Sequence, residues 1–108
     1  MTVTLQEPLG EYFAAANTDD PDRIAACFSK DAVVTDEKQT YQGQAAIRAW
    51  AEEARRKYQF QADVVAVEAG AVQTVVTAHL TGDFPGNPVD LRYAFTIADR
   101  EINALEIA

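Results

Sequence analysis

The first half of the chain carries apolar side chains three and four residues apart, the spacing typical of amphipathic helices. This spacing predicts one helix over Leu5–Asn17 and another over Gln44–Tyr58, the second with charged residues on its opposite face. Between them, the stretch T-D-D-P-D-R starts a short helix, because Asp19 or Asp20 can cap it and Pro21 suits its first position. The apolar face of this short helix comprises Ile24, Cys27 and Phe28.

The second half changes to the two-residue alternation of half-buried strands. Runs rich in Val, Thr, Ile, Tyr and Phe predict strands over Phe60–Glu68, Val72–Leu80, Asp90–Ala98 and Ile102–Ile107. The glycines and prolines of G-D-F-P-G-N-P indicate a long hairpin loop between the second and third of these strands. An earlier, shorter strand around Ala32–Val34 ends at Asp36, and a polar loop follows it as far as Gly43.

This order of elements predicts a single α+β domain over residues 1–108. Three helices on one face of a curved, mostly antiparallel sheet leave a cavity between helices and sheet, which is the default location for a ligand. The aromatic residues expected to line this cavity and contact a substrate, with plain core packing as the alternative for each, are Phe28, Trp50, Phe60, Tyr93 and Phe95.

Charge and composition exclude several classes of partner and site. The net charge of −8 and a pI near 4.4 exclude nucleic acid and anionic membrane surfaces as expected partners. No apolar run approaches the roughly 20 residues of a membrane span, and the N-terminus has no signal-peptide pattern, so we expect a cytoplasmic protein. The chain has one cysteine and one histidine, His79, without metal-ligand spacing, and no phosphate-binding loop; we expect no metal and no cofactor.

The order of elements and the stretch G-D-F-P-G-N-P-V-D-L-R-Y-A-F-T-I resemble the nuclear transport factor 2-like superfamily and, within it, the small SnoaL-like group. The resemblance implies a cystatin-like α+β cone that holds a pocket. It implies several alternative functions, because this scaffold occurs in isomerases, cyclases, dehydratases and interaction modules.

A more specific resemblance covers Glu11–Asp36, which is similar without gaps to the corresponding part of ketosteroid isomerases. In that family a tyrosine on the first helix contributes to an oxyanion hole, and an aspartate that closes the first strand is the proton-shuttling base. Tyr12 and Asp36 match these positions. The nearest match to the family's third group, a protonated aspartate, is Asp90, but the alternation places Asp90 on the sheet face opposite to Tyr93.

The residues themselves give Asp36 two interpretations. It shares a strand face with Ala32 and Val34, so it lies at the rim of the cavity if these two face the core. Desolvation there would raise its pKa and make it a general base near neutral pH. The alternative is a solvated strand end. Tyr12 is likewise either a core residue or a hydrogen-bond donor to a bound oxygen.

The predicted function is acid/base catalysis by Asp36, with Tyr12 as donor, on an apolar small molecule that carries a carbonyl. The reaction would be an isomerisation, cyclisation or dehydration without a cofactor. The alternative is a non-catalytic module that binds a ligand or a partner, for which the outward residues of the sheet, His79 among them, would matter more. A homodimer formed through the sheet is expected.

Overall fold

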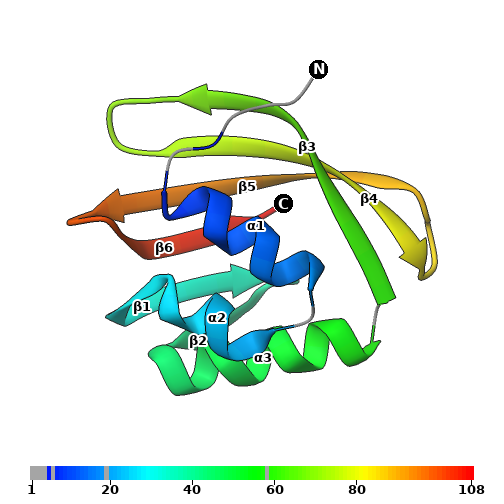
Figure 1. The fold of residues 1–108 in the computed structure, drawn as a ribbon, viewed down its shortest axis with the longest axis horizontal. Coiled ribbons are helices and arrows are strands. Elements are labelled where there is room, and N and C mark those ends of the chain that lie inside the picture. Colours follow the sequence, from blue (N-terminus) through cyan, green and yellow to red (C-terminus); the bar gives the residue numbers. More distant parts are fainter. Residues whose placement is uncertain (1–4, 6, 19, 58) are drawn as a thin grey trace.

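The computed structural model of the protein describes residues 5, 7–18, 20–57 and 59–108, except for the side chain of Lys57. Helices precede and follow the first two strands, and the remaining strands run consecutively to the C-terminus (Figure 1). In chain order the elements are α1 (Leu9–Asn17), α2 (Pro21–Ala26), β1 (Phe28–Asp36), β2 (Gln39–Gln42), α3 (Gln44–Lys57), β3 (Gln59–Ala69), β4 (Thr74–Asp83), β5 (Val89–Ala98) and β6 (Glu101–Ile107).

The described residues form one six-stranded mixed sheet with the order β2-β1-β6-β5-β4-β3. The C-terminal strand β6 lies between β1 and β5, parallel to β1 and antiparallel to β5. The other neighbours pair antiparallel, and the register of β3 shifts between Val64 and Ala66, where this long strand carries a bulge. The sheet is therefore mostly antiparallel, as predicted.

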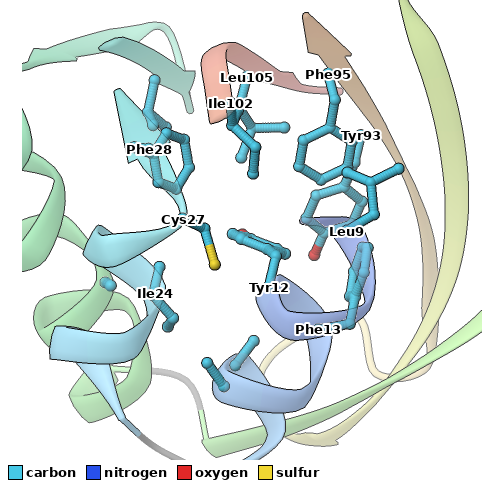
Figure 2. Packing of buried hydrophobic residues seen from close by; sticks show 14 of the residues in the cluster. Leu9, Tyr12, Phe13, Ile24, Cys27, Phe28, Tyr93, Phe95, Ile102 and Leu105 are labelled. Atoms are coloured by element: carbon cyan, nitrogen blue, oxygen red, sulfur yellow. The ribbon is translucent and has the colours of Figure 1, made fainter. Parts of the chain in front are cut away.

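Aromatic side chains join α1 to the sheet. The rings of Tyr12 and Phe95 lie edge to face with centroids 5.4 Å apart, and those of Phe13 and Tyr93 lie 5.2 Å apart in the same manner. Figure 2 shows Tyr12 among the other large side chains of this core, between Phe28 and Phe13. The helix spacing of α1 and the strand alternation of β5 thus meet in one buried cluster.

The second helix ends earlier than its apolar pattern predicts. Its start is confirmed, because the Asp20 carboxylate accepts a hydrogen bond from the Arg23 backbone N–H at 3.2 Å, and Pro21 is its first residue. Asp19, the other predicted cap, lies outside the described residues. The helix stops at Ala26, and Phe28 opens β1 instead of extending the helix, because it pairs with Ile102 of β6. A partner strand more than 70 residues away leaves no trace in the local pattern.

The predicted polar loop contains an additional strand, β2, which pairs with β1 from Asp36 and Gln39 onwards. The two-residue turn between them is Glu37-Lys38, whose φ angles of 51° and 66° lie in the left-handed region. Glycine or asparagine usually marks such a turn, and neither is present here, so the sequence carried no hairpin signal.

The remaining boundaries differ by a few residues. Helix α1 begins at Leu9, directly after Pro8, rather than at Leu5. Strand β4 begins at Thr74 rather than Val72 and continues to Asp83. Tyr58, the predicted end of the third helix, lies outside the described residues.

Candidate functional site

A cavity of about 870 Å³ opens between the helices and the concave side of the sheet. This volume is within the range of small-molecule sites. Its wall combines six aromatic side chains with four charged ones. The aromatic residues are Tyr12, Tyr41, Trp50, Phe60, Phe84 and Tyr93, and the charged residues are Asp36, Glu37, Glu53 and Arg55.

The structure brings most of the sequence-predicted site residues to this cavity. Tyr12 and Asp36 line it, and so do three of the five expected substrate contacts, Trp50, Phe60 and Tyr93. The other two expected contacts, Phe28 and Phe95, are 0% exposed and belong to the core, outside the cavity wall. The ring of Tyr12 on α1, which does line the cavity, lies edge to face against both of them.

The carboxylate of Asp36 is held in a defined position at the end of β1. The indole Nε1 of Trp50 donates a hydrogen bond to its Oδ2 at 3.0 Å, and the backbone N–H of Glu37 also bonds to the carboxylate. Trp50 is on the face of α3 that packs towards the sheet, together with Ile47, Ala51 and Ala54, so the helix register aims the indole at β1.

Burial raises the pKa of the Asp36 carboxyl above its usual value, because water is partly excluded from the charged form. The negative charge of Glu37 adds to this rise. The hydrogen bonds from Trp50 and from the Glu37 backbone act in the opposite direction, and the pKa stays raised overall. Asp36 is thus a half-buried carboxyl group with a raised pKa, not a solvated strand end.

Two phenol hydroxyls share the cavity with Asp36. Neither Tyr12 nor Tyr93 has a hydrogen bond from its hydroxyl to another described residue, and no described polar side-chain atom is both fully inaccessible and unpaired. Both hydroxyls therefore reach open space within the cavity. Burial raises the pKa of both phenols, and the Asp36 charge raises them further, so each keeps its proton and can donate it.

His79 and Asp90 lie outside the cavity, on the opposite face of the sheet, as the strand alternation predicts for Asp90. The two are cross-strand neighbours, and His79 Nδ1 lies 2.7 Å from Asp90 Oδ1 at the exposed surface. Asp90 therefore contributes nothing to an oxyanion hole beside Tyr12.

Sequence reasoning missed several cavity residues. Trp50 was predicted as a wall residue but not as the donor to Asp36, because nothing local relates α3 to the end of β1. Tyr41 was assigned to a loop and instead lies on β2, with its ring 6.2 Å from that of Trp50. Arg55 was assigned to a polar helix face, although its position four residues after the buried Ala51 places it beside the inward face of α3.

Among the residues that the structure describes, no group of three or more His, Cys, Asp and Glu side chains is arranged to hold a metal ion. No helix in the same set is long and apolar enough to cross a membrane. The sole cysteine, Cys27, is buried, which raises the pKa of its thiol to about 11.

Comparison with known proteins identifies the family to which this chain belongs. The family model for the SnoaL-like domain matches residues 9–102. A protein from Sinorhizobium meliloti, provisionally named a polyketide cyclase, is 37% identical, with 93% of this chain and 92% of that chain covered and a TM-score of 0.88. No curated protein matches the sequence.

More distant structures show the fold alone. A hypothetical protein from Catenulispora acidiphila with a ketosteroid isomerase-like fold, solved in complex with trimethylamine, is 15% identical, with coverages of 95% and 86% and a TM-score of 0.83. The epoxide hydrolase/cyclase-like enzyme SalBIII of salinomycin pyran ring formation is 20% identical, with coverages of 92% and 84% and a TM-score of 0.78. The family match and the 37% identity together establish that the chain belongs to the SnoaL-like domain family, within the nuclear transport factor 2-like superfamily.

Proposed function

We propose that this protein binds an apolar small molecule with a carbonyl group in its cavity and isomerises, cyclises or dehydrates it, with Asp36 as the acid/base. The observation that carries this proposal is the Asp36 carboxylate in the cavity wall, half-buried, fixed by Trp50 and raised in pKa. A base with a raised pKa accepts a proton more readily than a solvated carboxylate does.

The proposed step is removal of a proton from the carbon next to the carbonyl. Asp36 takes the proton, and the electron pair of the broken C–H bond moves to the carbonyl oxygen, which becomes an enolate. The hydroxyls of Tyr12 and Tyr93 reach the cavity and can donate hydrogen bonds to that oxygen, which stabilises its developing charge.

The three outcomes differ in what the enolate does next. In an isomerisation, Asp36 returns the proton to another carbon of the conjugated system. In a cyclisation, the enolate carbon attacks a second carbonyl of the same molecule, whose C=O π electrons move to its oxygen, and Asp36 returns the proton to that oxygen. In a dehydration, the enolate expels a β-hydroxyl, which takes the proton from Asp36 and leaves as water. Each outcome balances with proton transfer alone. The cyclase name of the Sinorhizobium meliloti protein supports the second outcome.

Hydrogen–deuterium exchange tests the step without knowledge of the product. A panel of cyclic ketones and β-keto esters is incubated with the protein in D₂O, and loss of the α-proton signal is followed by NMR. We expect exchange above background for at least one apolar ketone. The Asp36→Asn variant should lose about 10²- to 10⁴-fold of that rate, the usual contribution of a general base.

Asp31→Asn is the matched control, because Asp31 lies on the same strand, is exposed and does not line the cavity. Its exchange rate should equal that of the wild type. Exchange that survives Asp36→Asn, or that falls equally in both variants, would contradict the proposed role of Asp36.

A further inference from the structure

Arg55 is a cation in the cavity wall without a carboxylate partner among the described residues. The other two arginines of α3 differ from it. Arg48 pairs with Asp22 and Glu52 at the surface, and Arg56 pairs with Glu52 and Glu53. These surface pairs leave the cavity-lining guanidinium as the uncompensated one of the three.

The bonds that Arg55 does make use one nitrogen and neutral acceptors. Its Nη1 donates to the backbone oxygen of Ala16 at 2.9 Å and to that of Phe60 at 2.6 Å. Its guanidinium carbon lies 5.2 Å from the centroid of the Phe60 ring. These contacts orient the group, and among the described residues its Nε and Nη2 make no hydrogen bond.

The free edge of Arg55 has the geometry of a carboxylate site. Nε–H and Nη2–H are parallel donors that match the two oxygens of one carboxylate. A half-buried cation that contacts carbonyl dipoles and an aromatic ring, but no carboxylate among the described residues, gains from such an anion, because the surrounding medium screens the attraction less than water does. Glu53, an acid of the same wall, already pairs with Arg56 at 3.3 Å.

Arg55 and the proposed base, Asp36, line the same cavity. Arg55 follows Trp50 by five positions on α3, a rise of about 7.5 Å along the helix axis. Trp50 in turn holds Asp36. A ligand that fills the cavity can therefore present its reacting carbon to Asp36 and an anionic group to Arg55.

We propose that the substrate of this cavity is an acid: an apolar, carbonyl-bearing molecule whose carboxylate binds the Nε and Nη2 edge of Arg55. This inference rests on the proposed function of the same site, and it adds the charge of the substrate. The Nε–H and Nη2–H donors of Arg55 would select an anionic group and fix its distance from Asp36.

Binding of one skeleton in three charge states tests the proposal. The probes are 2-naphthylacetate, its neutral amide 2-naphthylacetamide, and the cationic 2-(2-naphthyl)ethylamine, measured by isothermal titration calorimetry at pH 7.5. We expect the acid to bind wild-type protein at least about tenfold more tightly than the amide, the effect of a charge-assisted hydrogen-bond pair. The preference should shrink as salt is raised.

Arg55→Gln should reduce the acid-to-amide ratio to within about twofold, because an uncharged side chain attracts both probes alike. Arg55→Lys should keep a smaller preference for the acid, since an ammonium group retains the charge but lacks the two parallel N–H donors of the guanidinium. Arg56→Gln is the matched control, because it removes the same charge from the neighbouring exposed position, and its ratio should equal that of the wild type.

Tightest binding of the amide or the amine by wild-type protein would overturn the proposal, as would an acid preference that survives Arg55→Gln. The affinity of the amide reports whether the Arg55→Gln cavity is intact. If that variant does not fold, the wild-type and Arg56→Gln ratios decide, and ratios near one overturn the proposal. Asp36→Asn should retain the acid preference while it loses α-proton exchange, so the two proposals fail separately.

Discussion

Asp36 occupies a position where the burial of an ionised carboxylate opposes stability. In the unfolded chain its carboxylate is fully hydrated, whereas in the folded protein burial raises its pKa above the usual value. The folded state then binds more protons than the unfolded state in the pH range between the two pKa values. The free energy of unfolding therefore falls as pH rises through that range, and at neutral pH the ionised Asp36 destabilises the fold.

Asp36→Asn should accordingly unfold at a higher temperature than wild-type protein at pH 8, because asparagine carries no charge to desolvate. The gain should shrink as the pH is lowered and the wild-type carboxyl takes up its proton. Thermal melts between pH 8 and pH 4 measure it, with exposed Asp31→Asn as the control. A lower melting temperature at pH 8, or a gain that does not depend on pH, would contradict the argument.

Among the elements, β3 is the edge strand at one end of the sheet and needs protection along its free side. Asn17, the last residue of α1, provides it at Ala62. Its side-chain Nδ2 donates to the Ala62 backbone oxygen at 2.8 Å, and its Oδ1 accepts from the Ala62 backbone N–H at 2.8 Å. The asparagine amide thus takes the place of a neighbouring strand and fixes the end of α1 beside the cavity.

Asn17→Ala should lower the free energy of unfolding by about 1–3 kcal/mol, because it leaves a partly buried N–H and C=O of β3 without partners. Asn103→Ala is the comparison, since Asn103 is half-buried like Asn17 but its side chain makes no hydrogen bond to a described residue. Urea denaturation of the three proteins measures the difference. Equal midpoints for Asn17→Ala and wild type would show that the amide pairing does not stabilise the edge.

For the molecule as a whole, the helices cover the concave face of the sheet and leave the other face open (Figure 1). The exposed face of β4, β5 and β6 carries the half-exposed small or β-branched side chains of Thr77, Ala94, Thr96 and Ala104. Charged and polar side chains, among them Arg92 and the His79–Asp90 pair, lie beside them on the same face. A sheet face that no helix covers suits self-association, and we propose that it pairs with a second copy of the chain.

Light scattering coupled to size exclusion should therefore give twice the chain mass of 11.8 kDa. Ala94→Arg places a long charged side chain at the centre of the proposed interface and should shift the protein towards monomer. Ala45→Arg, on the exposed side of α3, should leave the mass unchanged. A monomeric wild-type protein would contradict the dimer.

The periodicity of the sequence was sufficient for much of the fold and part of the site. Helix spacing placed Tyr12 on the inward side of α1, and strand alternation separated Tyr93, which faces the cavity, from Asp90, which does not. The resemblance to ketosteroid isomerases added the pairing of Tyr12 with Asp36. Such patterns succeed because the face on which a side chain lies depends only on backbone geometry within its own element.

Only the tertiary structure decided the relations between elements. It made Phe28 and Phe95 core residues, gave Asp36 its Trp50 donor and added β2 through a turn without glycine. It also left Arg55 in the cavity wall without a carboxylate partner among the described residues. Each of these depends on how α3 and α1 pack on the sheet. Packing is a property of many distant side chains at once, so a local pattern determines which way a residue faces but not what it meets there.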